Sequence, residues 1–465
     1  MAIQSYLSKI LHGAGVFTVL KSSRDIKLLF AQRFFRLFAY GTTFLILVHF
    51  LASLGISDKL AGLFMTLTML GDALISFVLV LITDRFGRRK ILALGAILMV
   101  MSGAVFSISS TYWLLVLASV VGVISPSGNE IGPFRAVEES ILSQLTEKDD
   151  RSDIFAWYTM CGSAGAAIGT ITSGWIVQVL TKNAAAAEVK AYRIIFILYA
   201  ALGIIKLALV LLLSSRVELH DQNTEYQAVI ELEDEELLSA TSSPRHSTEE
   251  RPQNNIVGRL RALLPQVTRK SLVILFRLIL LFALDSFASG MASPSWLTYF
   301  FTTVHDVEPA TLGTLFFTTN VLATLSNFAA LPLARRLGPL KTMTFTHLPS
   351  AIFLALIPIP KAGTPGTLMS MALLSLRACT QSMDQAPRQA FLAAVMKPEE
   401  RTAILGVINI VKTIAQGGGI GSSGVLAAGK SWHIMLGGAG LMKATYDLLI
   451  LWTFLGVPDR EDEER

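Results

Sequence analysis

An apolar run near the start of the chain ends at Asp84, a short basic turn follows, and a second apolar run begins at once. The turn, Asp84–Lys90, reads DRFGRRK. Its Gly87 can supply the tight reversal, because glycine adopts positive φ without a steric penalty. Short loops rich in lysine and arginine between membrane helices stay on the cytoplasmic side. The stretch 71–92 therefore predicts two membrane-spanning helices joined by a cytoplasmic turn.

The composition extends this prediction to the whole chain. Mean hydropathy is +0.56 and only 16% of the residues are charged, whereas a soluble domain carries about 25%. Runs of roughly 20 apolar residues recur, and each is long enough to cross a bilayer as a helix. The net charge of +5 needs no nucleic acid to explain it, because the basic residues gather in short turns. Cys161 and Cys379 both lie in apolar runs, which argues against a disulfide or a metal site.

We predict an all-α integral membrane protein with twelve transmembrane helices in two pseudo-symmetric six-helix bundles. The expected helices span residues 27–53, 60–83, 90–109, 112–134, 153–180, 193–215, 271–301, 310–334, 342–360, 366–390, 402–428 and 433–456. The expected segments are a cytoplasmic N-terminal segment, an N-terminal bundle, a linker, a C-terminal bundle and a cytoplasmic tail, at 1–26, 27–215, 216–270, 271–456 and 457–465. The linker is polar, so we expect it to be disordered. No signal-peptide cleavage pattern precedes the first helix, which is expected to direct insertion.

An internal repeat is expected to relate the two bundles. Gly62–Lys90 aligns without a gap on Gly313–Lys341, which places Gly87 over Gly338. Three shorter matches follow in order along the chain: Glu130 and Pro133 with Asp384 and Pro387, Asp149–Ser152 with Glu399–Thr402, and Gly203 and Lys206 with Gly440 and Lys443. Four matches in order favour duplication of a six-helix unit, a pattern found in many transporters.

The basic turn resembles the signature between the second and third helices of the major facilitator superfamily, G-x-L-x-D-R-x-G-R-K. The matching positions are Asp84, Arg85, Gly87, Arg88 and Arg89, while Val80 stands at the leading glycine. The resemblance covers most of residues 25–456. It is best to a fungal-type group of uncharacterised members, with GNEIGPFR on helix 4 and D-x-x-P-R-Q on helix 10. It implies two related bundles and a central loop. Helix 5 lacks the Gly-Pro pair of proton antiporters and helix 4 lacks their early arginine, which speaks against drug/proton antiport.

The distribution of basic residues predicts the orientation. Turns on one side carry clusters of lysine and arginine at 85–90, 335–341 and 397–401, whereas the opposite side has only scattered lysines. We therefore expect both termini and the central loop to be cytoplasmic. The plasma membrane is the favoured location. An acidic dileucine pattern at 233–238 leaves the vacuolar membrane as an alternative.

Charged side chains inside the predicted spans are the candidates for a transport cavity, because burying a charge there costs about 2.5–3.5 kcal/mol. The candidates for proton or substrate binding are Asp285, Arg36, Glu130, Asp384 and Arg377. Asp285 and Arg36 lie at similar depths in helices 7 and 1. We expect them to form an ion pair between the bundles, which protonation of Asp285 would release. The alternatives are a static pair and an arginine that extends to the cytoplasmic edge.

The basic turn and the inner parts of helices 4 and 10 are the candidates for a cytoplasmic gate. The predicted gate residues are Asp84, Arg85, Gly87, Arg88, Arg89, Arg135 and Arg388. By the resemblance, Asp84 caps helix 11 near Arg401 when the cytoplasmic side is closed, and the arginines of the turn bridge to acids on nearby turns. Pro133 and Pro387 are expected to kink helices 4 and 10. Alternatively, the turn serves insertion alone and the charges on helices 4 and 10 are salt bridges that only close the inner face.

Two lysines and a row of glycines complete the set of candidate residues. Lys206 and Lys443 occupy equivalent repeat positions on helices 6 and 12, and we expect both to extend to the membrane edge. Gly162, Gly165 and Gly169 on helix 5 predict close approach of a neighbouring helix.

The predicted function is secondary active transport of a small polar or charged molecule by alternating access, as a symporter or antiporter. Protons are the expected coupling ion, and no cofactor or metal is expected. The chain has no G-x-x-x-x-G-K-[ST] motif for ATP-driven pumping, and its histidines are scattered, so we expect no enzyme. The expected partners are the bilayer and the substrate, without nucleic acid, for a monomer. Two alternatives are a non-transporting nutrient sensor on a transporter fold and a proton-antiport efflux pump for drugs or metabolites.

Overall fold

The computed structural model describes residues 16–122, 124, 133–147, 150–182, 188–218, 269–396 and 398–455. Within these ranges the secondary structure is helical, without strands. The N-terminal half contains α2 (Val16–Lys21), α3 (Arg24–Phe44), α4 (Leu47–Ser53), α5 (Asp58–Phe86), α6 (Arg88–Ile108), α7 (Tyr112–Gly122), α8 (Pro133–Leu145), α9 (Arg151–Thr181), α10 (Glu188–Leu211) and η2 (Ser215–Val217). The C-terminal half contains α13 (Arg269–Met291), α14 (Pro294–His305), α15 (Pro309–Leu337), α16 (Pro339–Leu356), α17 (Thr364–Gln381), α18 (Gln385–Val395), α19 (Pro398–Ala428), η3 (His433–Gly437) and α20 (Gly438–Phe454).

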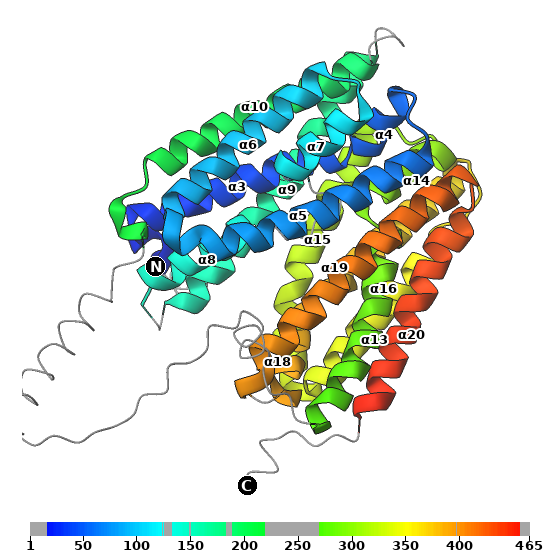
Figure 1. Cartoon of the computed structure of the whole chain (residues 1–465). Coiled ribbons are helices and arrows are strands. Elements are labelled where there is room, and N and C mark those ends of the chain that lie inside the picture. Colours follow the sequence, from blue (N-terminus) through cyan, green and yellow to red (C-terminus); the bar gives the residue numbers. More distant parts are fainter. Residues whose placement is uncertain are drawn as a thin grey trace, which may run out of the picture.

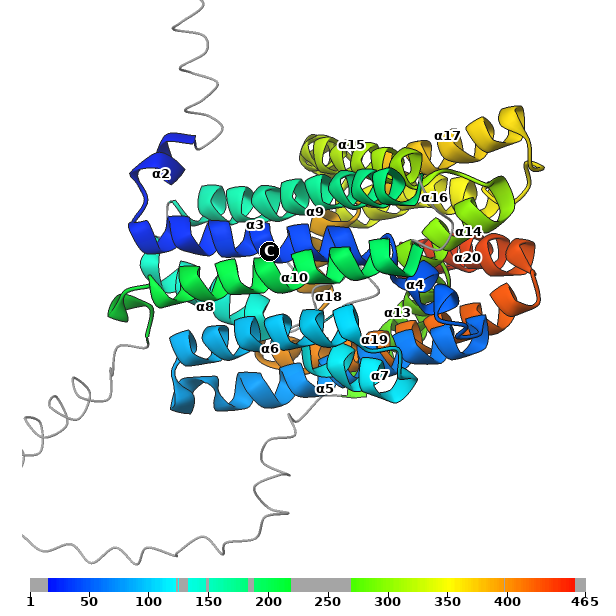
Figure 2. The same ribbon diagram turned by 90° about the horizontal axis from the view of Figure 1, so that it is seen from above.

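The helices form two bundles, one from each half of the chain (Figure 1). Seen from above, the long helices of both bundles run roughly along one direction (Figure 2). Seven helical segments of the described chain are long and apolar enough to cross a membrane, and the bent pair α3–α4 makes an eighth. The predicted all-helical membrane fold in two bundles is confirmed, while the full count of twelve spans stays a prediction. The central part of the predicted linker lies outside the described residues.

Several predicted spans are broken into two helices. The axis bends by 43° between α3 and α4. Pro294 begins α14, where its fixed φ suits a first turn and its missing N–H costs nothing. The expected kink inside a helix at Pro387 is wrong, because the predicted span breaks between α17 and α18 and Pro387 is the third residue of α18, in a first turn whose N–H groups need no helical partner. The residues just before Pro133 lie outside the described residues, so the kink expected there stays a prediction.

Glycines let helices within each bundle approach closely. A Cβ on Gly165 of α9 would overlap the carbonyl oxygen of Phe34 on α3. In the C-terminal bundle, a Cβ on Gly419 of α19 would overlap the carbonyl oxygen of Phe287 on α13. The predicted close packing at the helix 5 glycines is therefore confirmed.

The two bundles touch at one end of the molecule. Gly62 near the start of α5 packs against Gly424 near the end of α19, and a Cβ on Gly62 would lie 2.8 Å from the Gly424 Cα. Gly174 of α9 and Gly313 of α15 make the equivalent contact between the other pair of helices. The hydroxyl of Thr66 on α5 also donates to the backbone carbonyl of Gly417 on α19 at 2.8 Å.

At the opposite end the bundles diverge. Figure 1 shows them converging near α4 and α14 and separating toward the end that carries α8 and α18. The start of α3, the end of α10 and the end of α20 lie at this diverging end. The molecule is therefore closed at the end where Gly62 meets Gly424 and splayed at the end that carries the start of α3 and the end of α20.

Candidate functional site

Asp285 lies among buried ion pairs in the C-terminal bundle. From α20, the Lys443 ammonium donates to Asp285 Oδ1 at 2.7 Å. From α18, the Arg388 guanidinium donates to Asp285 Oδ2 at 3.2 Å. Lys443 also donates to the Ser289 hydroxyl, one turn further along α13, at 2.7 Å. A buried carboxylate held by two cations is sensitive to any change in either partner, because an unpaired charge in this environment is costly.

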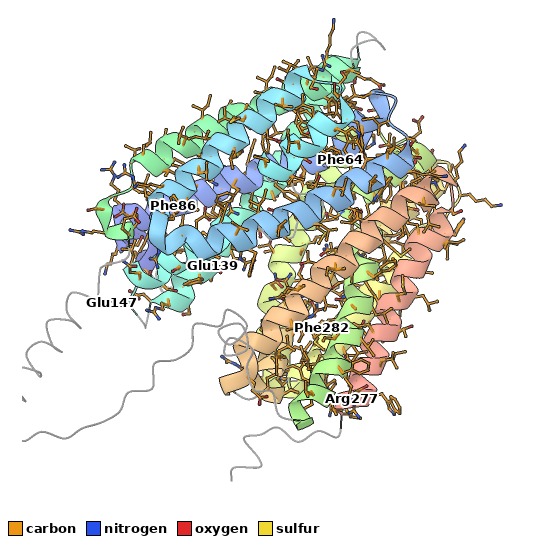
Figure 3. The ribbon with its side chains drawn as sticks, in the orientation of Figure 1. Phe64, Phe86, Glu139, Glu147, Arg277 and Phe282 are labelled. Carbon is orange, nitrogen blue, oxygen red and sulfur yellow. The ribbon has the colours of Figure 1, made fainter. Side chains whose placement is uncertain are left out.

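Arg388 connects Asp285 to a second acid. The carboxylate of Asp384, which immediately precedes α18, accepts a hydrogen bond from Arg388 Nη2. The guanidinium lies 5.6 Å from the centroid of the Phe282 ring on α13 and 5.7 Å from that of the Tyr446 ring on α20. Both distances are within the range of cation–π attraction. Phe282 is labelled in Figure 3 and lies near the middle of α13. The arginine therefore joins α13, α18 and α20.

A histidine and an aspartate form another buried pair in this bundle. Nδ1 of His347 on α16 lies 2.9 Å from each carboxylate oxygen of Asp447 on α20. Asp447 lies one turn beyond Lys443 on the same helix. The sequence did not predict this pair. Both residues lie within predicted apolar spans, which was a signal, but nothing in their spacing indicated that they meet.

A separate cluster occupies the N-terminal bundle. Arg36 of α3 pairs with the buried carboxylate of Glu138 on α8 at 2.6 Å. The Tyr158 hydroxyl of α9 donates to the same carboxylate. The guanidinium of Arg33 lies 4.5 Å from the centroid of the Tyr158 ring. This cluster therefore joins α3, α8 and α9 as the first cluster joins helices of the C-terminal bundle.

The expected ion pair between Arg36 and Asp285 is wrong. Arg36 pairs with Glu138 in its own bundle, and Asp285 pairs with Lys443 and Arg388 in the other. Their similar depth in the sequence does not show which way each side chain turns. Each turns toward counter-charges within its own bundle, which reduces the cost of burying it.

The expectation that Lys206 and Lys443 extend to the membrane edge is also wrong. Both side chains are buried. Lys443 reaches Asp285, and the Lys206 ammonium lies 4.5 Å from the centroid of the Phe134 ring. A lysine is long enough to reach either an edge or an interior partner, and here each finds an interior one.

The basic turn between α5 and α6 is centred on Gly87, whose φ of 92° provides the expected reversal. The resemblance implies bridges from its arginines to acids on nearby turns when that side of the molecule is closed, whereas the bundles diverge here at the end that carries this turn, and Arg88 and Arg89 have other partners (Figure 1). The Arg88 guanidinium donates to Gln144 Oε1 at 2.6 Å and to the Ser140 hydroxyl at 2.9 Å, both on α8. The Arg89 guanidinium donates to a backbone carbonyl at the end of α10.

An acid does bind this turn, but through the backbone. The Glu218 carboxylate accepts hydrogen bonds from the N–H groups of Arg88 at 2.7 Å and Arg89 at 3.1 Å. These are the first N–H groups of α6, which have no helical partner and favour a negative charge. Glu218 was not predicted as a partner, because it lies in the polar segment 216–270 that is expected to be a disordered linker.

The remaining predicted residues have different outcomes. Arg135 of α8 pairs with Glu139 at 2.6 Å, as their spacing predicts; Glu139 is labelled in Figure 3. Arg388 pairs with Asp285 and Asp384, and its predicted role in the gate stays a prediction. Arg377 forms no ion pair within the described part of the chain.

Some predicted roles cannot be compared with the structure. Glu130 lies outside the described residues, and the side chains of Asp84 and Arg85 are not described. The cavity role of Glu130 and the cap of Asp84 on helix 11 therefore stay predictions. Within the described ranges, no three or more His, Cys, Asp or Glu side chains gather as a metal site.

Known proteins are similar to this chain in sequence. The profile of the Major Facilitator Superfamily matches residues 29–283 and 275–465. An uncharacterized membrane protein of Saccharomyces cerevisiae is 34% identical over 443 residues, which cover 94% of this chain and 95% of that protein. The multidrug resistance protein MdtH of Photorhabdus laumondii is 27% identical over 134 residues, 29% of this chain and 32% of its own length.

Solved structures share the fold. A D-xylose-proton symporter has a TM-score of 0.65 at 15% identity, over 93% of this chain and 98% of the symporter. The peptide transporter POT has a TM-score of 0.64 at 15% identity, over 92% of this chain and 93% of its own. The nucleoside transporter NupG has a TM-score of 0.62 at 13% identity, over 92% of this chain and 98% of its own.

Proposed function

The chain belongs to the Major Facilitator Superfamily, and from this we propose that it carries a small polar or charged molecule across a membrane by alternating access, coupled to protons. In such a cycle the two bundles rock against each other about a central site. The protein acts as a carrier, with lipid and substrate as its partners.

One observation carries this proposal. Every ion pair between two described side chains stays within a single bundle. The bundles meet instead through glycine contacts, such as Gly62 on Gly424. They also meet through side-chain contacts that are not ion pairs, such as the Tyr299 hydroxyl on Asp58 and the ring of Phe44 against that of Phe316. Separating the bundles therefore breaks no ion pair between described side chains. This arrangement supports rocking of rigid halves.

The positive-inside rule supports an orientation with both termini in the cytoplasm. In that orientation the splayed end faces the cytoplasm and the glycine contacts close the outer side. We propose that the structure is the inward-facing member of the transport cycle. The plasma membrane is the proposed location, with the vacuolar membrane as the alternative.

The charge of the two clusters supports a polar or charged substrate. Carboxylates and guanidinium groups within a bilayer are retained at a cost, so they usually serve binding or coupling. The symporter, peptide transporter and nucleoside transporter of the same fold are named for polar solutes. A sugar, a short peptide and a nucleoside are therefore the first substrates to test.

The test uses purified protein in proteoliposomes and a panel of labelled sugars, peptides and nucleosides. Uptake is measured with and without an imposed pH gradient, against liposomes without protein. We expect at least one member to accumulate when the gradient is present. Replacing Asp285 by Asn should abolish this accumulation and leave exchange of labelled for unlabelled solute. Flux that ignores the gradient would contradict proton coupling, and a protein without flux or exchange for any compound would favour the nutrient sensor.

A second candidate function is efflux of drugs or metabolites in exchange for protons. The local similarity to MdtH favours it, although that similarity covers 29% of this chain. The absence of the Gly-Pro pair on helix 5 weighs against it. Efflux of fluorescent cations from the same proteoliposomes tests this candidate, because the first proposal predicts none.

A further inference from the structure

Six buried or nearly buried side chains form one connected line in the C-terminal bundle. In order they are Asp384, Arg388, Asp285, Lys443, Asp447 and His347. Hydrogen bonds join all neighbours in this line except Lys443 and Asp447, which lie four residues apart on α20 and therefore share a face of that helix. Lys443 thus lies between two acids, and it bonds to Asp285 in this structure.

The charge of this line depends on His347. The other five groups carry three negative and two positive charges, and Lys412 beside Phe282 supplies a third positive charge near Asp285, so the effect of His347 falls on Asp447, its direct partner. Histidine is the side chain whose charge ordinarily changes between about pH 5 and 8. An imidazolium at His347 gives the Asp447 carboxylate a counter-charge in direct contact, whereas a neutral imidazole leaves that carboxylate without an ion-pair partner among the described side chains, which is costly in a medium of low polarity.

We propose that His347 is a proton-binding site, and that its protonation state determines whether Lys443 pairs with Asp285 alone or interacts with both Asp285 and Asp447. This inference rests on the proposed transport function and names the site of its proton coupling. When His347 is protonated, the imidazolium balances Asp447 and Lys443 stays with Asp285, as observed here. When His347 is neutral, Asp447 attracts Lys443, and Asp285 depends more on Arg388. Loss of the proton therefore weakens the link between α13 and α20 and favours the other conformation.

Other charged groups near this line of side chains add to its total charge but, apart from His433, do not change their own charge between about pH 5 and 8. Lys412 of α19 lies 5.6 Å from the centroid of the Phe282 ring and makes no ion pair with a described side chain. The remaining titratable or charged groups on α16 and on the helices packed against it are Arg335, Arg336, Lys341, Arg377, Cys379, His433 and Tyr446. Lysine, arginine and tyrosine keep their ordinary charge between about pH 5 and 8, and Cys379 is replaced by alanine in the test below. His433 is exposed, so it provides a matched control.

The test measures the separation of the bundles with the proton as the only ligand. Spin labels are placed at Glu147→Cys in the N-terminal half and Leu337→Cys at the end of α15, both exposed positions of the splayed end. Cys161 and Cys379 are first replaced by alanine. The distance distribution is measured in lipid nanodiscs between about pH 5 and 8. We expect two distances, a long one for the splayed conformation and a short one for the other conformation. As the pH rises and one proton is lost, the ratio of the long-distance to the short-distance population should fall by up to about tenfold per pH unit.

Three substitutions separate the proposal from a general loss of packing. His347→Gln should abolish the pH dependence and resemble the wild type at high pH. His347→Lys, which is permanently charged, should abolish it and resemble the wild type at low pH. Asp447→Asn keeps the shape of the side chain, and its ratio of the two distance populations should also match that of the wild type at low pH. His433→Gln should behave as the wild type. A general loss of packing would not shift the ratio of the two distance populations in opposite directions in His347→Gln and His347→Lys.

The outcomes also separate this inference from the proposed function. A pH dependence that survives His347→Gln, or a wild-type ratio that ignores pH, overturns the proton site while two distances still support a carrier. A single distance under every condition contradicts alternating access itself.

Discussion

The ammonium of Lys443 lies 2.7 Å from the carboxylate of Asp285, and both residues belong to the C-terminal bundle. The N-terminal bundle holds its own buried pair, between Arg36 and Glu138 at 2.6 Å. Because these buried ion pairs lie within a bundle and not between bundles, the two bundles can move relative to each other without breaking them. The following predictions test this arrangement residue by residue.

Removing one partner of the buried pair should destabilise the protein. Lys443→Met leaves Asp285 with one cation fewer, and breaking a buried pair costs about 3–5 kcal/mol. Reversible unfolding in detergent measures this free energy. Asp285→Asn added to Lys443→Met should recover part of the loss. The exposed pair of Arg135 and Glu139 is the control, since Arg135→Ala should cost at most about 1 kcal/mol. A Lys443→Met protein as stable as the wild type would contradict the pair's importance.

Double-mutant cycles should show that Arg36 is coupled to Glu138 and not to Asp285. Arg36→Met combined with Glu138→Gln should deviate from additivity by more than about 1 kcal/mol, because the two side chains are in contact. Arg36→Met combined with Asp285→Asn should be additive within about 0.5 kcal/mol. If the unfolding free energies instead showed coupling of Arg36 to Asp285 and additivity with Glu138, an ion pair between the bundles would be supported.

Gly62→Ala should weaken closure at the end where the bundles touch. Its Cβ would lie 2.8 Å from the Gly424 Cα, which is too close without a shift of backbone. Overpacking of this kind costs about 1–3 kcal/mol, or roughly a 5- to 150-fold change in the closed population. A cysteine at Thr66 should then react faster with an impermeant maleimide. Gly406→Ala is the control, because a Cβ there meets nothing within 4 Å. Equal rates in both variants would argue against the glycine contact.

Glu218→Ala should loosen the start of α6. Its carboxylate accepts hydrogen bonds from the N–H groups of Arg88 and Arg89, and losing a helix cap costs about 0.5–2 kcal/mol. Hydrogen exchange of these two amides should accelerate, while exchange in α15 should not change. Glu147→Ala removes an exposed acid as the control. Unchanged protection at Arg88 and Arg89 would show that Glu218 does not hold the turn.

The sequence predicted the helices well and the partners of the charges poorly. The apolar runs and the turn at Gly87 determine where membrane helices lie, because a bilayer requires about 20 apolar residues for each crossing. The orientation of a side chain around its helix requires the packing of the bundle. The sequence could not show that Arg36 turns to Glu138, or that Lys443 turns inward to Asp285.

Two further omissions have the same origin. His347 and Asp447 lie in different helices far apart in the chain, and only packing of α16 against α20 brings them together. Glu218 follows η2 in a polar stretch whose composition indicates disorder, yet its carboxylate caps the N-terminus of α6. Composition describes a segment as a whole and does not identify the single residue at its edge that binds α6.

Covalently locking the bundles tests the central claim most directly. A Cβ built on Gly421 lies 3.9 Å from the Thr66 Cβ, within the range of about 3.5–4.5 Å that a disulfide requires. Thr66→Cys with Gly421→Cys, in a chain without its native cysteines, joins α5 to α19 at the closed end. Solute exchange in proteoliposomes is then measured before and after reduction, with each single cysteine variant as a control. We predict that exchange is lost in the oxidised protein and restored by reduction, whereas full exchange through the locked protein would contradict transport by rocking bundles.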